Sequence, residues 1–400
     1  MAVKKDFGKE SVRLHEKLGG KLRVESKVPV RSRHDLSLAY TPGIAQVSLE
    51  VSRHPSRAFD LTIKKNSLAV ISDGSKVLGL GNLGALGAIP VMEGKCVLFK
   101  EFGGIDAFPI CISTQDEKEL IQTIRNIAPV FGAINLEDIA APKCFAVEAA
   151  LQDLGIPVYH DDQHGTATVV YAGLLNAAKV AKKRFSDLRV CINGSGAAGI
   201  SIANMLLGKN APASFPRVHD VILCDSQGVI HSSRKDLSPE KKHLLSYTNI
   251  HHVSGHLPDA LRDADVFIGV SVAGALQKEW ISLMSPRPII FALANPTPEI
   301  MPALALAAGA CVMATGRSDF PNQVNNALVF PGVFRGAIDA RAVRITPGMN
   351  MAAAQTLAKM IPRPSASNIL PALSDRSVAR KIAKAVAAQA KKENVIRPKK

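Results

Sequence analysis

A glycine-rich segment in the middle of the chain limits the possible folds more than any other feature. It follows an apolar run (188–193), precedes a helical pattern (197–207), and consists of Gly194, Ser195, Gly196, Ala197, Ala198 and Gly199. A strand, a glycine turn and a helix in this order are typical of dinucleotide-binding domains, where missing side chains allow a pyrophosphate to approach the helix N-terminus. Glycine turns without a nucleotide also occur, so the motif alone leaves both interpretations open.

The rest of the second half of the chain continues this alternation. Further apolar runs follow at 218–225, 265–270, 288–294 and 310–314. Apolar strands that alternate with helices predict a doubly wound parallel sheet whose two faces are covered. We expect this Rossmann-like domain to span 160–400, to begin with a long helix over 165–183, and to end with a helix over 377–391 that packs back on the body.

The first half has a different pattern. Short apolar runs at 67–72, 96–99 and 108–112 stand among glycines, and helical spacing at 117–130 and 145–154 separates or follows them. This pattern predicts a mixed α/β domain over 1–159. With 400 residues, 47% of them hydrophobic, the chain is long and apolar enough for two α/β domains.

Composition narrows the classes of partner. The formal net charge of +15 would suit nucleic acid, an acidic membrane surface or small polyanions. Basic residues gather in short runs, several at the chain ends, and only 5% of residues are aromatic, so a base-stacking platform is not expected. The uncharged segment 300–316 is short for a membrane span, and the charged N-terminus lacks a signal-peptide core, which predicts a cytoplasmic protein that binds neither nucleic acid nor membrane.

Two acidic doublets precede the glycine segment. Glu137 and Asp138 stand in INLEDIAAP, and Asp161 and Asp162 stand in YHDDQHGTA. Glu137, Asp138 and Asp162 could supply three carboxylates to Mg²⁺ or Mn²⁺, because hard cations prefer oxygen ligands. Each doublet could instead be a helix N-terminus or a solvated turn. The neighbouring histidines at 160 and 164 suggest zinc less strongly, since the six cysteines are far away with no zinc-like spacing.

Lys95 and Tyr40 are candidates for proton transfer. Lys95 lies between apolar stretches, where burial would lower the pKa of its ammonium toward a value useful for a general base. A lysine whose charged end reaches solvent from a strand edge is the alternative. Tyr40, in LAYTPG, could be a proton donor on a rigid turn or simply a core residue.

Three more side chains are expected to line the nucleotide crevice. Asp225 ends a predicted strand and could accept hydrogen bonds from an adenosine ribose, which favours NAD, although Arg234 and Lys235 could instead bind the phosphate of NADP. Asn295 follows a predicted strand and Asn326 opens an apolar segment. Both amides could hold a carboxylate substrate or cap a turn.

Eight segments together resemble the malic enzyme family in its shorter bacterial form. They lie in order along nearly the whole chain and read SLAYTPG, SDGSKVLGLGNLG, PVMEGKCVLFK, INLEDIAAP, HDDQHGTA, NGSGAAG, FALANPTPE and QVNNALVFPG. Several long motifs in register are far more specific than a glycine signature. The resemblance implies oxidative decarboxylation of L-malate to pyruvate with reduction of NAD or NADP and a divalent metal.

The resemblance also implies roles for individual residues. Tyr40 would be the general acid and Lys95 the general base, with Asp161 as a close neighbour of Lys95. Glu137, Asp138 and Asp162 would be the metal ligands, and Asn295 and Asn326 would hold the substrate carboxylate and the nicotinamide ribose or amide. The glycine segment 194–199 would hold the pyrophosphate.

One position departs from the family pattern. Lys76 stands where many members from higher organisms carry an arginine for the substrate carboxylate, and lysine offers charge without a bidentate fork. The family further suggests a homodimer, for which apolar N-terminal segments offer surface. A malolactic decarboxylase that retains its nicotinamide and releases lactate, or a non-catalytic nucleotide sensor, are the alternatives.

Overall fold

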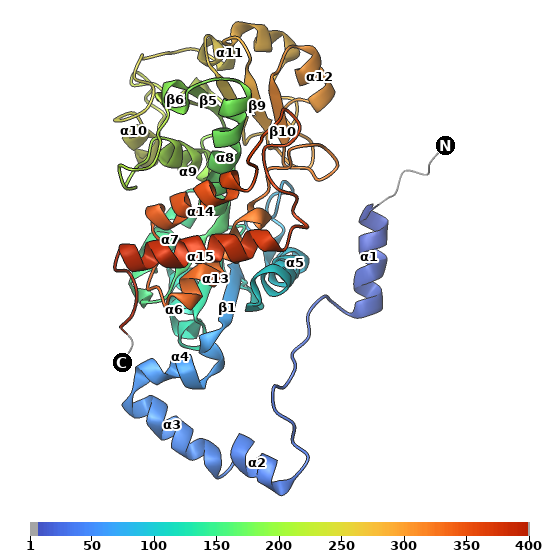
Figure 1. Ribbon diagram of the computed structural model, residues 1–400, viewed down its shortest axis with the longest axis vertical. Helices are drawn as coiled ribbons and strands as arrows, with labels where there is room; N and C mark the ends of the chain where they lie inside the picture. The colour runs from blue at the N-terminus through green and yellow to red at the C-terminus, as the bar shows by residue number, and fades with distance from the viewer. Residues whose placement is uncertain (1–6, 399–400) are drawn as a thin grey trace.

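The computed structural model describes residues 7–398, so the terminal lysines of the basic clusters at the chain ends lie outside it. Two sheets form two lobes that a long helix connects (Figure 1). The structure confirms the predicted mixed α/β first half followed by a Rossmann-like sheet.

The helices are α1 (Phe7–Leu18), α2 (Arg33–Ala39), α3 (Gly43–Arg53), α4 (Ala58–Leu61), α5 (Gly84–Gly103), α6 (Glu117–Ile127), α7 (Lys143–Ala150), α8 (Asp161–Val180), α9 (Ala197–Leu206), α10 (Pro239–Leu244), α11 (Leu257–Leu261), α12 (Pro302–Ala307), α13 (Phe330–Asp339), α14 (Pro347–Lys359) and α15 (Ser377–Lys392).

The first sheet has four parallel strands in the order β2-β1-β3-β4. Its strands are β1 (Ser67–Ser72), β2 (Asp106–Cys111), β3 (Ala133–Leu136) and β4 (Val158–His160). Every residue of β1 is buried, which explains why this strand is apolar without alternation. The apolar run 96–99 is not a strand, because it lies inside α5, whose buried side chains include Cys96 and Phe99.

The second sheet has six strands in the order β10-β9-β8-β5-β6-β7. Its strands are β5 (Arg189–Asn193), β6 (Asp220–Asp225), β7 (Gly228–Val229), β8 (Val266–Gly269), β9 (Ile289–Ala292) and β10 (Val312–Thr315). All neighbours are parallel except β6 and β7. The chain leaves β5 in opposite directions toward β6 and β8, so the β5–β8 boundary is the switch point at which nucleotides bind in such sheets.

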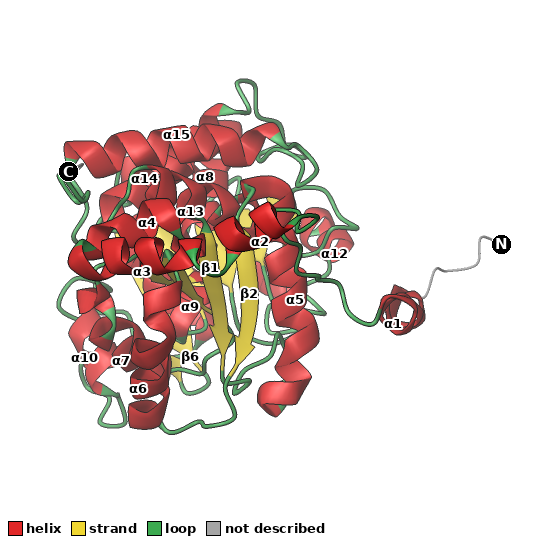
Figure 2. Ribbon diagram, turned by 90° about the horizontal axis from the view of Figure 1, so that it is seen from below, coloured by secondary structure: helices red, strands yellow, loops and turns green. Residues whose placement is uncertain are grey.

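The C-terminal helices return to the first lobe, as expected for the last of them. The helices α13 and α15 pack on each other and on α5, and α14 packs on α8 (Figures 1 and 2). Phe99 of α5 contacts the rings of Phe330 and Phe334, with centroids 4.7 and 5.3 Å apart. Because this packing is continuous with the core around α8, the first sheet and the start of the second are held in one arrangement.

The N-terminal helices α1, α2 and α3 lie apart from both lobes (Figure 1). None of their residues is buried, and all three lie within the part of the chain that the structure describes. In that same part, no helix is both long and apolar enough to cross a membrane. The segment 300–316 contains α12 and the whole of β10, whose four residues are all buried.

Candidate active site

The pairing of β3 with β4 brings the two acidic doublets together. Leu136 is opposite His160 in this parallel pair, so Glu137 and Asp161 are the next residues at the same edge of the sheet. The carboxyl ends of parallel strands are where α/β proteins build their sites. The helix α8 begins at Asp161, four residues earlier than the sequence predicted, because acidic side chains are favourable in the first turn of a helix.

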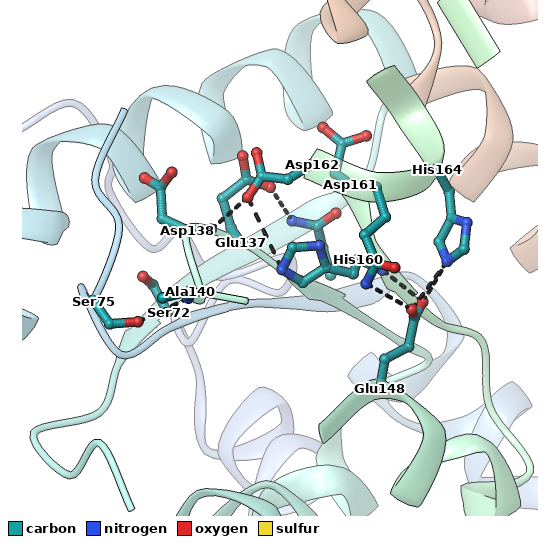
Figure 3. Close-up of polar contacts among 12 residues, drawn as sticks. Ser72, Ser75, Glu137, Asp138, Ala140, Glu148, His160, Asp161, Asp162 and His164 are labelled. Carbon is teal, nitrogen blue, oxygen red and sulfur yellow. Dashed lines mark hydrogen bonds and ion pairs between the residues drawn. The ribbon is translucent and has the colours of Figure 1, made fainter. Parts of the chain in front are cut away.

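Three carboxylates form a possible cation site at this edge. Glu137, Asp138 and Asp162 each offer an oxygen within 4.8 Å of the others (Figure 3). Asp138 has a φ of 54°, a left-handed conformation that aspartate tolerates better than most residues, and its N–H donates to Asp162 at 3.0 Å. One oxygen of Asp138 is buried without a hydrogen-bond partner. A buried, unpartnered oxygen beside two further carboxylates fits a hard divalent cation.

Lys95 joins this cluster from α5. Its ammonium donates to Glu137 at 2.5 Å and to Asp161 at 2.5 Å, and it lies 4.4 Å from the centre of the Phe330 ring. The side chain is only 8% exposed, so Lys95 does not reach solvent from a strand edge. The structure thus places the expected base beside the expected metal ligands.

The electrostatics of Lys95 correct one prediction. Burial by itself lowers the pKa of Lys95, but the charges of Asp161, Glu137 and Asp162 outweigh it and raise the pKa above its ordinary value. Burial, with a further contribution from Asp162, raises the pKa of Asp138 to about 7. Burial raises the pKa of Glu137 as well, although Lys95 opposes that shift. The sequence could not show that the carboxylates would surround the ammonium.

Glu148 and Gly165 support the site, and sequence reasoning missed both. Glu148 accepts hydrogen bonds from the His160 N–H at 2.9 Å and the Gln163 amide at 3.1 Å, and it contacts His164 at 2.9 Å. A Cβ atom at position 165 would lie 1.8 Å from Asp161 Oδ1, so only glycine leaves room for that carboxylate. A lone glutamate in the apolar segment FAVEAAL was the available signal for Glu148.

The histidines do not form the alternative zinc site. His164 pairs with Glu148, whose charge raises the pKa of the imidazole against the lowering effect of burial. His160 is completely buried, which lowers its pKa, and it lies 4.0 Å from Asp162. Within residues 7–398, the three-carboxylate group is the candidate metal cluster.

A loop over 73–83 covers the carboxylates. The N–H of Lys76 donates to the Asp138 carbonyl at 3.1 Å, and the N–H of Leu78 donates to the Asp138 carboxylate at 3.3 Å. The side chain of Lys76 is exposed. Burial raises the pKa of Asp162, but the charges of His160, Lys95 and Lys76 outweigh burial, and the net shift is downward. Lys76 therefore lies beside the carboxylate cluster with an exposed side chain.

Both asparagines lie close to this site. A Cβ at Gly79 would meet the Asn295 carbonyl at 2.0 Å, and a Cβ at Gly165 would meet the Asn326 Cβ at 3.3 Å. Asn295 follows β9 in the second lobe, whereas Asn326 begins the short 3₁₀ helix Asn326–Leu328. Asn295 thus lies beside the loop 73–83, and Asn326 lies beside the first turns of α8.

The glycine segment has the geometry that a nucleotide turn requires. Gly194 has a φ of 117°, and a Cβ there would lie 2.6 Å from the Val270 carbonyl oxygen. A Cβ at Gly199 would lie 1.8 Å from the Gly194 oxygen, so glycine allows α9 to pack closely on the turn. Ser195, Gly196, Ala197 and Ala198 complete the turn, and Gly196 directly precedes α9.

Asp225 ends β6 as predicted, but its carboxylate already has two basic partners. Arg234 donates to it at 2.7 and 3.1 Å, and Lys241 donates at 2.6 Å. Burial raises the pKa of Asp225, but the hydrogen bonds from Arg234 and Lys241 lower it by more, so the net shift is downward. Lys241 was not expected from the sequence, because it is 16 residues away in α10.

Tyr40 is the one expected catalytic residue that the structure leaves outside this group. It follows α2, and its side chain is 65% exposed. Its helices precede the amino end of β1, whereas the carboxylates follow the carboxyl ends of β3 and β4 (Figure 1). Within one chain, α2 and α3, which flank Tyr40, therefore lie apart from α5, which carries Lys95 (Figure 1).

Comparisons with known proteins agree with this arrangement. Residues 19–152 match the malic enzyme N-terminal domain, and residues 163–391 match the malic enzyme NAD-binding domain. The bifunctional malic/malolactic enzyme of Bacillus subtilis is 49% identical over 97% of this chain and 94% of its own length. The NAD-dependent malic enzyme of Geobacillus stearothermophilus is 46% identical over 99% of this chain and 83% of its own.

A solved structure shows the same fold. The NAD-dependent malic enzyme of Thermotoga maritima superposes with a TM-score of 0.90 and 45% identity, covering 94% of this chain and 98% of its own. Both halves of the chain and their order are thus those of known malic enzymes. The chain belongs to the malic enzyme family.

Proposed function

We propose that the protein converts L-malate to pyruvate and CO2 while reducing NAD or NADP, and that it uses Mg²⁺ or Mn²⁺. The observation that carries this proposal is the buried Lys95 ammonium, bound to Glu137 and Asp161 beside the carboxylates of Asp138 and Asp162. A base next to a cation site and a nucleotide crevice is the combination that hydroxyl oxidation followed by decarboxylation requires.

The cation would be held by Glu137, Asp138 and Asp162. Glu137 and Asp138 are buried, Asp162 is partly buried, and one oxygen of Asp138 has no hydrogen-bond partner, a set of carboxylates that fits a divalent ion. When bound, such an ion offsets the negative charge around Lys95 and withdraws electrons from the oxygen at C2, which favours loss of the distal carboxylate.

The protein's side chains would perform the proton transfers. Lys95, in its neutral form, removes the proton of the C2 hydroxyl while the C2 hydride passes to the nicotinamide. Asp161, bonded to the same Nζ atom, positions Lys95. The C3–C4 bond then breaks and CO2 leaves. The electron pair of that bond forms the C2–C3 double bond, while the C2 carbonyl pair moves onto its oxygen to give the enolate of pyruvate. Tyr40 would donate a proton to C3, and the oxygen's pair then re-forms the carbonyl of pyruvate.

Other residues would hold the substrate and the nucleotide. Lys76 and the amides of Asn295 and Asn326 bind the malate carboxylates and the nicotinamide ribose or amide. The segment 194–199 binds the pyrophosphate at the N-terminus of α9. Because the Asp225 carboxylate occupies Arg234 and Lys241, which could otherwise bind a 2′-phosphate, we propose NAD as the principal cofactor with NADP also accepted.

Domain division and assembly belong to the same proposal. We propose domains over 1–159 and 160–400, which place one sheet in each. We also propose a homodimer, supported by the exposed apolar side chains of α1 to α3. The cytoplasmic location stays a prediction from the N-terminal sequence.

An assay with malate, Mn²⁺ and each nucleotide in turn tests the activity. We expect NADH or NADPH to form together with equal amounts of pyruvate and CO2. Asp162→Asn should abolish metal-dependent turnover and leave nucleotide binding intact, with Asp236→Asn as an exposed control. Unchanged turnover in Asp162→Asn would refute the ligand assignment.

Malolactic activity is the second candidate, because the Bacillus subtilis relative is described as a bifunctional malic/malolactic enzyme. It would release lactate without net NADH. Quantifying pyruvate and lactate in the same reaction separates the two activities.

A further inference from the structure

A pocket of about 430 Å³ lies between the two lobes, and no residue of the proposed mechanism lines it. Its walls come from α7 and β4 of the first lobe, from α8 and α9, and from α14. Pockets that hold small organic molecules in proteins usually measure about 300–1,000 Å³. This interlobe pocket therefore has the size of a ligand site and is separate from the carboxylate cluster and from the nucleotide segment 194–199.

Two polar side chains inside the interlobe pocket are more than nine-tenths buried and have groups without a hydrogen-bond partner. Ser201 of α9 is 8% exposed, and its hydroxyl has no partner within residues 7–398. Asn350 of α14 is 7% exposed, and its Oδ1 atom accepts from the Tyr159 hydroxyl at 3.3 Å. In the same part of the chain, its Nδ2 atom has no partner. Because buried polar groups are normally paired, these two donors indicate an occupant that accepts hydrogen bonds.

The charge at the rim of the pocket favours an anion. Lys209 is half-buried there, with its ammonium 3.9 Å from the centre of the Tyr247 ring and with no acidic partner among the described residues. The Tyr247 hydroxyl donates to Asn204 Oδ1 at 2.7 Å, so the amide N–H groups of Asn204 remain available. Glu148 also lines the pocket, but its carboxylate already binds three groups of the segment 160–164. The ammonium is thus left to pair with a ligand.

Much of the remaining wall is apolar. It includes Phe145, Val158, Ile200, Met205 and Ile345. An occupant must therefore combine an apolar body with an anionic group for the rim. It also needs a second oxygen for the hydroxyl and amide donors inside. A carboxylate matches one ammonium and one amide, because its two oxygens accept hydrogen bonds and carry a single negative charge.

The pocket wall also holds the turn that carries Asp161 and Asp162. Glu148 accepts from the His160 N–H at 2.9 Å and from the Gln163 amide at 3.1 Å (Figure 3). Gln163 itself lines the pocket. An occupant that packs against Glu148 and Gln163 restricts this turn, so less conformational freedom is lost when Asp162 binds a cation. Binding at the two sites should then be mutually favourable.

We propose that the interlobe pocket binds a small organic acid and that this acid tightens cation binding at the three-carboxylate group. The carboxylate of the acid binds Lys209 and Asn204 at the rim, and a hydroxyl or carbonyl oxygen at its other end meets Ser201 and Asn350. The binding of the acid follows from the pocket alone. The coupling rests on the proposed function, in which the three carboxylates hold Mg²⁺ or Mn²⁺.

Isothermal titration calorimetry with 4-hydroxybenzoate and 6-hydroxyhexanoate tests the pocket. We expect saturable binding of at least one acid by the wild-type protein, and much weaker binding of the uncharged 4-hydroxybenzamide. Lys209→Met should raise the Kd of the acid at least about 10-fold, because a charged hydrogen-bond partner is lost. Ser201→Ala, which removes only a neutral donor, should raise it about 3-fold.

Lys242→Met is the matched control for Lys209→Met. Lys242 is an exposed lysine of α10 that does not line the pocket, so its loss should leave the Kd of the acid unchanged. The absence of saturable binding for both acids would overturn the proposal. Equal affinity of the wild type and Lys209→Met would overturn it too, since the acid would then bind elsewhere.

The same titration with saturating Mn²⁺ tests the coupling. The Kd of the acid should fall at least about 5-fold, and the acid should lower the Kd of Mn²⁺ by the same factor. An acid affinity that does not respond to Mn²⁺ overturns the coupling. A protein that oxidises malate but binds neither acid keeps the proposed function and loses this inference. A protein that binds the acid but not Mn²⁺ refutes the cation site and the coupling together.

Discussion

A Cβ atom at Gly79 would lie 2.0 Å from the carbonyl oxygen of Asn295, so the two backbone segments are in direct contact. Gly79 belongs to the loop over the carboxylate cluster, and Asn295 follows β9 of the nucleotide-binding sheet. In the proposed mechanism, this contact sets the distance between the substrate and the nicotinamide. Hydride transfer depends on that distance, because reacting atoms must come within van der Waals contact.

Gly79→Ala should therefore impair turnover without unfolding the protein. The added methyl group has to move the loop or Asn295, and small misplacements in an active site cost up to about 100-fold in rate. Steady-state kinetics with malate should show a lower kcat/KM. Gly94→Ala is the matched control, because its methyl group would meet only the end of the Lys21 side chain at 3.3 Å. Equal kinetics for the two variants would show that the contact is unimportant.

Manganese should stabilise the folded protein, and this effect should depend on Asp138. A ligand at about 100 times its Kd adds roughly 2.7 kcal/mol to the free energy of unfolding. Asp138→Asn removes one ligand and one of three clustered negative charges. We expect higher stability than wild type without metal, since repulsion is relieved, but a much smaller gain on adding Mn²⁺.

Thermal unfolding with and without Mn²⁺ measures both effects of Asp138→Asn. Glu279→Gln, which removes an exposed charge far along the chain, should behave like wild type in both conditions. The same metal-induced gain in Asp138→Asn as in wild type would exclude Asp138 as a ligand.

Lys95→Met should reduce malate oxidation by about 10²–10⁴-fold, the usual contribution of a positioned base. Removing the ammonium also leaves two buried carboxylates unpaired, so we expect lower stability in the absence of metal. Lys64→Met is a useful control, since Lys64 is also partly buried and donates to the Phe131 carbonyl at 2.6 Å. It should lose stability but retain turnover. Full oxidation by a folded Lys95→Met protein would place the base elsewhere.

Asp225→Asn should shift the cofactor preference toward NADP. The substitution removes the negative charge that now pairs with Arg234 and Lys241, leaving both cations available to a 2′-phosphate. The ratio of kcat/KM for NADP to that for NAD should rise by about 10-fold, equivalent to ~1.4 kcal/mol. An unchanged ratio would mean that this pair of cations does not reach the nucleotide.

Glu299 should make stability depend on pH. It is completely buried, and burial raises its pKa above the ordinary 4.5, although the N–H groups of Ser271 and Ala294 donate to it and oppose the shift. A raised folded-state pKa means that the folded protein binds the proton more tightly than the unfolded chain. Its contribution to stability is therefore complete below pH 4.5 and is lost as the pH rises through the folded-state pKa.

Urea unfolding of wild type and Glu299→Gln between about pH 4 and pH 8 tests this behaviour. Wild type should lose stability relative to the variant as the pH rises, because glutamine cannot ionise. Contributions from the other titrating groups cancel in this difference. A difference between the two proteins that is constant with pH would contradict the assignment.

The sequence predicted most reliably the features that depend on the local backbone. Gly194 and Gly199 are glycines because a Cβ would collide with neighbouring backbone oxygens, a local constraint that is visible as a motif. The apolar runs predicted five of the six strands of the second sheet, all except the two-residue β7, for a similar reason, since strands covered on both faces must be apolar. The apolar run 96–99 lies in a helix and not in a strand, because a short apolar segment fits a buried helix equally well.

The chain by itself determined the family, the order of the two sheets and the residue types that the chemistry needs, because these depend on local spacing and on motifs in register. Only the tertiary structure decided what surrounds each group. Strand pairing placed Glu137 and Asp161 around Lys95 and reversed the expected direction of its pKa shift. The path of α2 and α3 left Tyr40 exposed and outside the carboxylate cluster, which no local sequence pattern could show.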